Sequence, residues 1–320
     1  MQRPKQGTLQ ITEIVDFHVL DAQLMDTNVT ISNRDTSPLP SASRNCEESV
    51  FGTGPDGSVI GITTMPGACT HVSADRAKPV ILFLNAGVLH RVGPHRLHVV
   101  AARQFASVGF PGMRLDLSGI GDSPPLRGDL TFRASAVTDI RAAMDSMANK
   151  YQSSSFVLFG LCSGADNAIA CALQDPRVTG LVLIDPPAYA TYRSRLRSAW
   201  GKFNRAQGFG EKLRLFTGVI GNRRRAQLQQ ATQGRQAPRP GDFRQWMTSL
   251  HDRGARLLCV YSGGYGARYN KAGQIFEALP ALRGKLEEVF LPSANHVFTE
   301  STQRGMLVDH VQRWLIRNFG

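Results

Sequence analysis

The fold is decided by the stretch SFVLFGLCSGADNAIACALQ, residues 155–174. Its first part is a short apolar run typical of a buried strand, and its second part has the composition of a helix. Between the two parts, Gly160 and Gly164 flank Cys162, and Ser163 follows directly. A strand–turn–helix of this kind holds its central residue in strained backbone at the end of the strand. The sequence therefore predicts an elbow in which Cys162, not Ser163, is the attacking nucleophile.

The rest of the chain alternates strands with helices around this elbow. A hairpin is predicted over residues 48–66, with its turn at Gly54–Gly57. Apolar runs typical of buried strands recur at 79–87, 178–186, 255–264 and 286–296. Strands that alternate with helices form a mostly parallel sheet with helices on both faces. We therefore predict an α/β fold with a mostly parallel central sheet.

The expected organisation has three parts. Residues 1–45 include a polar stretch with Pro and Ser and are predicted to form an N-terminal extension. The α/β core is expected over 46–189 and 251–320. Residues 190–250 interrupt the strand–helix alternation and contain helix-prone segments, so they are predicted to form a helical cap.

Positive charge is concentrated in this cap. The chain has a net charge of +12, and residues 191–240 contain twelve Lys or Arg against one acid, Glu211. A local basic cluster suggests an anionic partner, and we expect Arg223 and Arg224 to bind an anionic substrate. The alternative is that these side chains form a solvated helical face.

The composition excludes several classes. Its 42% apolar and 19% charged residues are ordinary for a globular protein, and no apolar stretch is long enough for a predicted membrane span. No secretory signal is visible, and five scattered cysteines without a CxxC pair fit a reducing cytoplasm better than a disulfide framework. No metal or cofactor fingerprint is present, so no metal or cofactor is expected. The basic segment lacks the pattern of a nucleic-acid-binding module, so no nucleic acid is expected either.

Three further motifs accompany the elbow: FLNAG (83–87), LDLSGIGDS (115–123) and PSANHVF (292–298). Together they resemble the α/β-hydrolase superfamily over residues 46–320. Within it, the layout looks most like hydrolases associated with bacterial exosortase and exopolysaccharide gene clusters. Dienelactone hydrolases and polyhydroxyalkanoate synthases are relatives that also carry Gly-x-Cys-x-Gly. The resemblance implies that a cysteine at the elbow can be active.

The resemblance also implies roles for individual residues. His296 occupies the loop that delivers the catalytic histidine, and the backbone amides of Ser163 and Gly87 occupy the oxyanion positions. Asn85 departs from the histidine usual in the oxyanion loop. We expect Asn85, His90 and His95 to line the substrate pocket.

The pattern leaves two candidates for the orienting acid. The superfamily usually places it after the strand at 255–264, where this chain has Tyr265 and no carboxylate. Asp185, at the end of the preceding strand, is the favoured candidate, and Asp166, in the first turn of the elbow helix, is the alternative. A Cys162–His296 dyad without an acid is also tolerable, because a thiol ionises far more readily than a hydroxyl.

The predicted function is hydrolysis or acyl transfer on an ester or thioester. The acyl group is expected to form a covalent thioester with Cys162 and then pass to water or another acceptor. The substrate is expected to be a small molecule or a carrier-bound acyl group, and an anionic one would suit the basic cap. The rival hypothesis is a catalytically inactive scaffold that binds an anionic partner or membrane through this cap. Oligomeric state is not specified by the sequence.

Overall fold

The computed structural model describes residues 46–54, 57–67, 78–125, 130–205 and 237–320. These residues all belong to one compact unit, Ser41–Gly320. The predicted N-terminal extension, residues 1–45, lies outside the described residues, and so do Arg223 and Arg224.

One sheet of eight strands forms the centre of this unit, in the order β1-β2-β4-β3-β5-β6-β7-β8. The strands are β1 (Cys46–Thr53), β2 (Val59–Pro66), β3 (Val80–Leu84), β4 (Gly112–Leu115), β5 (Phe156–Leu161), β6 (Val178–Ile184), β7 (Arg256–Ser262) and β8 (Glu287–Leu291). The pairs β1–β2 and β2–β4 are antiparallel, and every later pair is parallel. The predicted N-terminal hairpin and mostly parallel sheet are both confirmed.

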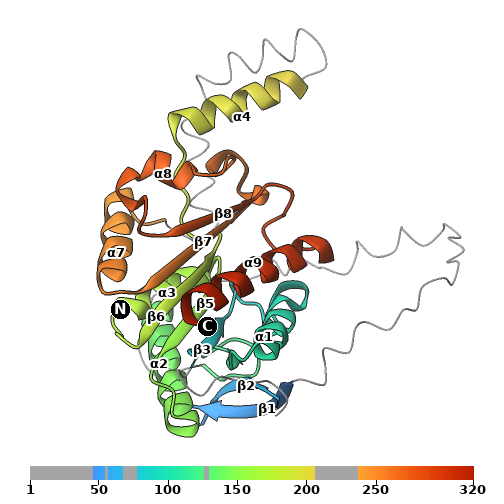
Figure 1. Cartoon of the computed structure of the whole chain (residues 1–320), viewed down its shortest axis with the longest axis vertical. Coiled ribbons are helices and arrows are strands. Elements are labelled where there is room, and N and C mark those ends of the chain that lie inside the picture. Colours follow the sequence, from blue (N-terminus) through green and yellow to red (C-terminus); the bar gives the residue numbers. More distant parts are fainter. Residues whose placement is uncertain (1–45, 55–56, 68–77, 126–129, 206–236) are drawn as a thin grey trace, which may run out of the picture. The chain divides into compact units, whose positions relative to one another are not determined.

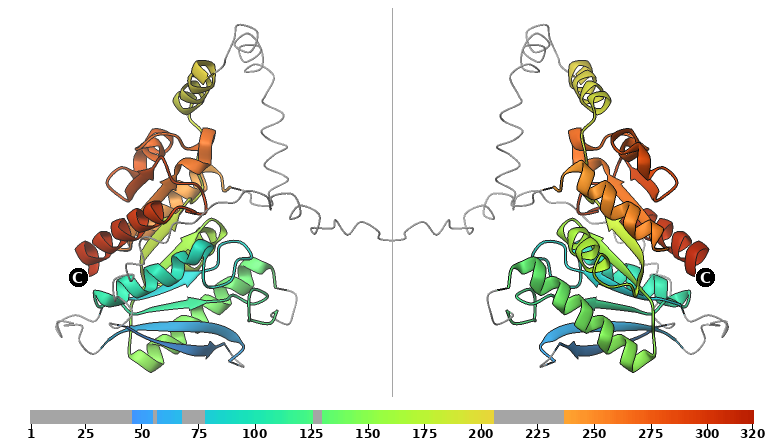
Figure 2. Two further views of the ribbon diagram at one scale, coloured as in Figure 1. Left: turned by 90° about the vertical axis from the view of Figure 1, so that its right-hand side faces the viewer. Right: turned by 90° about the vertical axis from the view of Figure 1, so that its left-hand side faces the viewer.

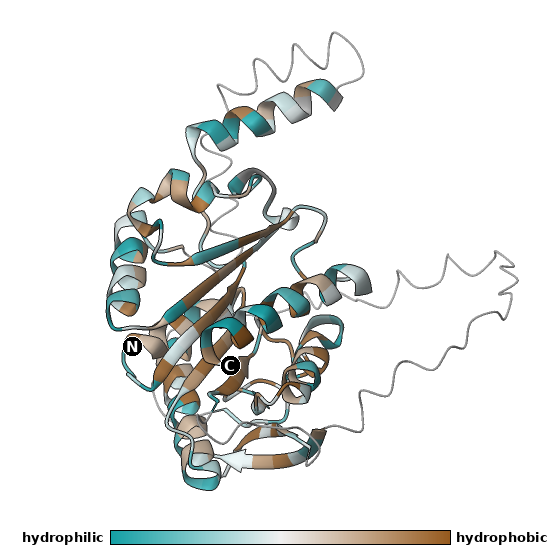
Figure 3. Ribbon diagram, viewed as in Figure 1, coloured by the Kyte–Doolittle hydropathy of each residue, from teal (hydrophilic) through white to brown (hydrophobic). Residues whose placement is uncertain are grey.

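Helices cover both faces of the sheet (Figures 1 and 2). Side chains alternate along each strand: Val80 and Leu82 of β3 face one hydrophobic cluster, and Ile81 and Phe83 face the other. The first cluster is completed by α2 (Phe132–Tyr151), α3 (Ser163–Ala172) and α7 (Pro240–Asp252). The second is completed by α1 (Leu97–Ser107) and α9 (Ser301–Phe319). Because both faces are buried, the inner strands are continuously apolar, as Figure 3 shows.

Short elements connect the larger ones. They are the 3₁₀ helices η2 (Pro94–Arg96), η3 (Gly263–Arg268) and η4 (Pro280–Leu282) and the short helix α8 (Gln274–Ala278). No described helix is long and apolar enough to cross a membrane.

Two described helices fall within the predicted cap at 190–250, and they differ in their packing. Helix α7 buries Phe243, Met247 and Leu250 in the core cluster that contains α2 and α3. Helix α4 (Tyr192–Arg205) instead contacts η3 and presents large apolar side chains to solvent. Residues 206–236 lie outside the described part of the chain. Helix α7 therefore packs as part of the core. A cap that includes α4 stays a prediction.

Candidate active site

The elbow between β5 and α3 has the strained backbone that its sequence predicts. Cys162 lies between the strand and the helix with φ 58° and ψ −117°, a region that side-chain-bearing residues rarely adopt. Its own N–H donates to Ile184 O at 3.0 Å, and its carbonyl accepts from Ala165 N–H at 3.0 Å. These backbone bonds hold the turn, and the thiol is half-buried.

The two glycines of the elbow are needed because backbone approaches backbone there. A Cβ on Gly160 would lie 2.3 Å from the carbonyl carbon and oxygen of Gly164. A Cβ on Gly164 would lie 2.8 Å from the carbonyl oxygen of Asn85. No flexible side chain stands in these contacts, so neither clash can be relieved cheaply. The sharp return of α3 beneath β5 therefore depends on glycine at both positions.

His296 lies in the loop after β8, and its ring nitrogen Nδ1 is 2.6 Å from Oδ2 of Asp185. Asp185 directly follows β6 and is completely buried. The structure thus brings Asp185 to the histidine, whereas the alternative acid, Asp166, lies in the first turn of α3.

The buried carboxylate of Asp185 has further donors. Ser262, at the end of β7, donates its backbone N–H to Oδ1 and its hydroxyl to Oδ2, each at 2.7 Å. Tyr265 donates its phenol to the backbone carbonyl of Asp185 at 2.7 Å. The backbone of Asp185 adopts φ 47°, which is unusual for a residue other than glycine. These bonds hold a strained residue in place and supply protein donors to its buried charge.

The environment of His296 favours its protonated form. The hydrogen bond with Asp185 raises the pKa of His296 most, a hydrogen bond with Cys162 raises it further, and burial opposes both, giving a pKa of about 9. Asp185, His296 and Cys162 therefore form one continuous chain of contacts. At neutral pH the imidazole carries a positive charge beside the thiol, the arrangement that stabilises a thiolate.

All three side chains emerge at the carboxyl edge of the parallel strands. Cys162 follows β5, Asp185 follows β6, and His296 lies in the loop after β8. Carboxyl ends of parallel strands share one edge of the sheet, where open α/β folds bind their ligands. Residues far apart in the sequence therefore meet at one site.

The two residues predicted as oxyanion donors are in direct contact. The N–H of Gly87 donates to the hydroxyl oxygen of Ser163 at 2.8 Å. Gly87 has φ 61°, which suits glycine. It lies in the loop after β3, next to the elbow. Ser163 is the first residue of α3, so its own N–H has no partner within that helix. Their use as oxyanion donors stays a prediction.

Asn85 lies in the same loop but is buried. Its amide nitrogen donates to Leu89 O at 2.8 Å and to Asp116 Oδ1 at 3.0 Å, and its amide oxygen accepts from Leu117 N–H at 2.8 Å. These bonds join the loop after β3 to the loop after β4. The side chain was expected to contact substrate, but its polar atoms are already engaged within the protein, so this geometry favours a role in positioning the Gly87 loop.

Asp116, the buried acid of the LDLSGIGDS motif, is the centre of this loop junction. It accepts the backbone N–H of Arg91 at 2.6 Å and also pairs with the guanidinium of Arg91. Arg91 bridges from Asp116 to Asp122, whose carboxylate lies 2.7 Å from its second terminal nitrogen. Neither Asp116 nor Arg91 was predicted individually from the sequence. The available signal was an acid directly after β4 and an arginine in the loop that follows β3.

His90 is partly exposed beside this pair, with Nε2 3.4 Å from Asp116 and 3.5 Å from Asp122. Among the described residues, these three form the one group whose ligand atoms lie close enough together to hold a metal ion. Arg91 already pairs with both carboxylates, and its positive charge opposes a cation there. His95, also expected near the pocket, lies 3.3 Å from the hydroxyl of Thr299 through Nε2. Substrate binding by either histidine stays a prediction.

Comparison with known proteins finds similarity to one hydrolase family. Residues 87–216 match the family model described as serine aminopeptidase, S33, a family of hydrolases. The matched segment contains the elbow between β5 and α3, with Cys162 at its turn. No curated protein is significantly similar to the chain.

Solved structures share the architecture at low identity. An esterase of Pyrococcus furiosus is 14% identical with a TM-score of 0.53, over 88% of this chain and 93% of the esterase. A dienelactone hydrolase of Anabaena variabilis is 14% identical with a TM-score of 0.52, over 86% of this chain and all of that protein (100%). A puromycin-hydrolysing peptidase of Mycobacterium tuberculosis is also 14% identical with a TM-score of 0.52, over 89% of this chain but 41% of the peptidase. The chain has the α/β-hydrolase fold.

Proposed function

We propose that this chain hydrolyses or transfers the acyl group of an ester or thioester through a covalent intermediate on Cys162. The observation that carries the proposal is the continuous contact from Asp185 through His296 to Cys162 at an elbow with φ 58°. The match to a hydrolase family model supports the same reaction class.

The reaction begins from a charged resting state. With a pKa of about 9, His296 is an imidazolium at neutral pH, and the proton that it carries is the one lost by the Cys162 thiol. The buried Asp185 carboxylate stabilises this imidazolium and fixes its ring. No separate deprotonation is then needed when substrate binds. A serine would instead require a neutral histidine, so the cysteine and the protonated histidine suit each other.

Acylation forms a bond between Cys162 Sγ and the carbonyl carbon, and the π electrons move to the carbonyl oxygen. The N–H groups of Ser163 and Gly87 donate to this oxyanion, which displaces the Ser163 hydroxyl from the Gly87 N–H. As the carbonyl re-forms, the bond to the leaving alkoxide or thiolate breaks. The imidazolium of His296 gives its proton to that leaving group and becomes neutral.

Deacylation runs the same steps with water or another acceptor. Neutral His296 takes a proton from the acceptor as it attacks the acyl carbon, and a second oxyanion forms at the same position. The bond to Cys162 Sγ then breaks and the thiolate leaves beside the protonated histidine. The centre returns to its resting charges.

The positive charge of residues 191–240 favours an anionic acyl donor within this class. A phosphate-bearing carrier, such as a coenzyme A thioester or a carrier-protein arm, combines a thioester with negative charge. We therefore propose an anionic acyl thioester ahead of a neutral ester.

Intact-mass measurement after incubation with acyl thioesters and activated esters tests the proposal. We expect a mass increase equal to one acyl group in the wild-type protein and none in Cys162→Ala. Asp166→Asn is the matched control, because it alters the alternative acid, in the first turn of α3, whereas Asp185 is the carboxylate that lies 2.6 Å from Nδ1 of His296. Absence of an adduct and of product with every donor would favour an inactive scaffold, and an adduct on Cys162→Ala would exclude Cys162 as the nucleophile.

A further inference from the structure

Helix α4 carries an exposed stripe of large apolar side chains. Tyr192 is 76% exposed, Leu196 is 51% exposed, Trp200 is 67% exposed and Phe203 is 38% exposed. At about 100° per residue, these four positions fall within an arc of about 80° on the helix. The rings of Trp200 and Phe203 stack with their centroids 6.1 Å apart. The stripe is therefore a continuous surface feature.

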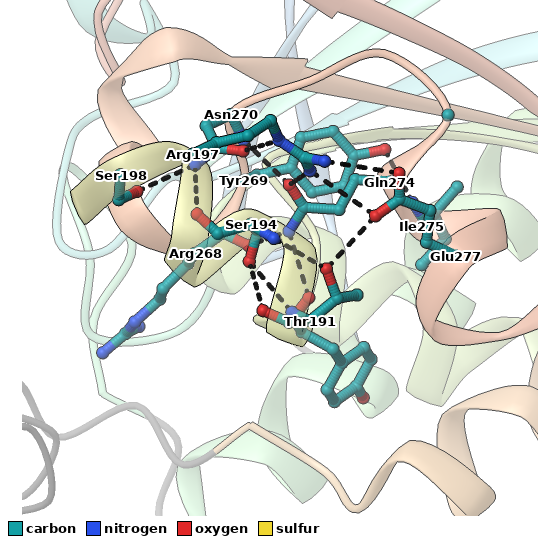
Figure 4. A network of polar contacts seen from close by, with 12 residues as sticks. Thr191, Ser194, Arg197, Ser198, Arg268, Tyr269, Asn270, Gln274, Ile275 and Glu277 are labelled. Atoms are coloured by element: carbon teal, nitrogen blue, oxygen red, sulfur yellow. Dashed lines mark hydrogen bonds and ion pairs between the residues drawn. The ribbon is translucent and has the colours of Figure 1, made fainter. Parts of the chain in front are cut away.

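The opposite face of α4 attaches the helix to the core (Figure 4). Arg197 donates to Asn270 at 3.0 Å and lies 3.5 Å from Glu277, while Asn270 donates to the carbonyl of Ser194 at 2.9 Å. Thr191 also donates to Glu277 at 3.2 Å. By the same helical geometry these attachments lie on the side away from the stripe. The core therefore holds α4 so that its apolar side faces outward.

The charges of α4 are of one sign. The helix has five Lys or Arg and no Asp or Glu. The exposed Arg193 and Arg195 fall on the two flanks of the apolar stripe at helical spacing. An aromatic apolar face between basic flanks is the composition of helices that lie in the interface of an anionic membrane. Tyr and Trp suit that interface because each ring has an apolar body and a polar group.

We propose that the Tyr192–Leu196–Trp200 face of α4 docks this protein on an anionic lipid surface. The apolar side chains enter the boundary between headgroups and acyl chains, and Arg193 and Arg195 reach the lipid phosphates. A second copy of the chain is a poorer occupant, because pairing two such faces brings basic flanks against each other. This proposal concerns a surface separate from the Cys162 centre and is independent of the chemistry there.

Vesicle co-sedimentation of the full-length chain tests the proposal. We expect the protein to sediment with phosphatidylcholine vesicles that contain phosphatidylglycerol and not with phosphatidylcholine alone. The double variant Leu196→Ser, Trp200→Ser keeps every charge and should bind at least tenfold more weakly. The matched control is Met306→Ser, Ile316→Ser, which removes two similarly exposed apolar side chains from α9 and should leave binding unchanged.

A second pair of variants tests the charges. Arg193→Gln, Arg195→Gln should weaken binding at least tenfold at low salt, and Arg133→Gln, Arg256→Gln, which neutralises two exposed arginines elsewhere, should have little effect. Melting curves verify that every variant is folded. Binding that survives loss of the α4 stripe would overturn the proposal by assigning the contact to another part of the chain, and failure of the wild-type protein to bind would also overturn it.

Tryptophan fluorescence supplies an independent readout. Of the three tryptophans, Trp314 is buried and Trp246 packs partly buried against the core, so the exposed Trp200 should dominate any blue shift when vesicles are added. Trp200→Phe should keep vesicle binding and lose most of the shift. Analytical ultracentrifugation without lipid tests whether a second copy of the chain occupies this face. A dimer that the Leu196→Ser, Trp200→Ser variant abolishes would identify self-association and contradict the lipid assignment.

Discussion

The carboxylate of Asp185 lies 2.6 Å from the imidazole of His296, although 111 residues separate them in the sequence. The contact joins the end of β6 to the loop after β8, and β7 lies between these two strands. Ser262, at the end of β7, completes the junction by donating twice to the same carboxylate. Three neighbouring strand ends thus fix the orientation of the histidine.

This contact predicts the behaviour of Asp185→Asn. Loss of the carboxylate removes the largest cause of the raised pKa of His296, so that pKa should fall from about 9 toward the ordinary value of 6.5. We expect turnover to fall about tenfold to a hundredfold, less than for a serine enzyme, because a cysteine depends less on the orienting acid. Titration of the imidazole by NMR and steady-state kinetics measure the two effects. In Asp166→Asn, the matched control, neither quantity should change appreciably; a larger effect there would reverse the assignment of the acid.

The same ion pair predicts a pH-dependent contribution to stability. Because the pKa of His296 is raised by folding, its protonated form stabilises the folded state fully below about pH 6.5, and this contribution is lost as the pH rises through about 9. Replacing the histidine in His296→Gln should flatten the change in melting temperature across this window. Melting curves between these pH values measure the slope in both proteins. Equal slopes would show that His296 is not the group responsible.

Much of the fold was predictable from the sequence because its signals are local. The apolar runs and the glycines at 160 and 164 indicate buried strands and a tight turn without knowledge of distant contacts. The backbone atoms around Cys162 require those glycines, so the sequence pattern and the geometry have one cause.

The acid could not be chosen from the sequence because its identity depends on long-range packing. Asp185 follows a predicted strand, and Asp166 lies in the first turn of the elbow helix, so both are near the elbow. No sequence pattern shows that Ser262 and Tyr265 donate hydrogen bonds to Asp185. Asn85 illustrates the same limit. Its position in the loop after β3 predicted a place in the substrate pocket, but only the structure shows that its amide nitrogen donates to the carboxylate of Asp116. The sequence prediction placed helix α7 in the cap for the same reason. Its apolar face is buried by residues far away in the sequence, and only the structure shows those contacts.

Ser163 offers a test of the residue beside the nucleophile. Its hydroxyl accepts the N–H of Gly87 at 2.8 Å, while the proposed chemistry uses its backbone N–H, which Ser163→Ala retains. We expect this variant to form the acyl-enzyme on Cys162 with a rate reduced by no more than about tenfold, the range of one neutral hydrogen bond. Peptide mass spectrometry of the trapped adduct locates the acyl group. An adduct on Ser163 in the wild-type protein would exclude the present interpretation of the elbow.

The basic segment gives a prediction about substrate encounter. Arg223, Arg224 and Arg225 lie outside the described residues, and they belong to the segment with a net charge of +11. Neutralising all three to Gln should raise KM for an anionic thioester and flatten its salt dependence, because such charges act over a Debye length of about 10 Å at 0.1 M salt. Kinetics at low and high salt, with kcat expected to change little, provide the measurement. Loss of kcat with an unchanged KM would instead place these arginines in the chemistry.

Replacing the nucleophile in Cys162→Ser tests whether the histidine is charged in the resting enzyme. A serine hydroxyl is not ionised at neutral pH and needs a neutral imidazole as its base. With a pKa of about 9, only about one imidazole in a hundred is neutral at pH 7. Asp185, the largest cause of that raised pKa, is still present in the variant, whereas the contribution of Cys162 is lost, so the pKa of His296 should lie below about 9 but stay raised. Acylation by Cys162→Ser should therefore be slower than wild type at pH 7 and should rise with pH as the imidazole loses its proton. The wild-type rate, which uses a thiolate already paired with imidazolium, should change less with pH.

Stopped-flow acylation with an activated ester measures both profiles, and Cys162→Ala gives the background rate at each pH. Parallel profiles for the cysteine and serine proteins would mean that His296 is neutral before attack and acts as a general base toward the thiol.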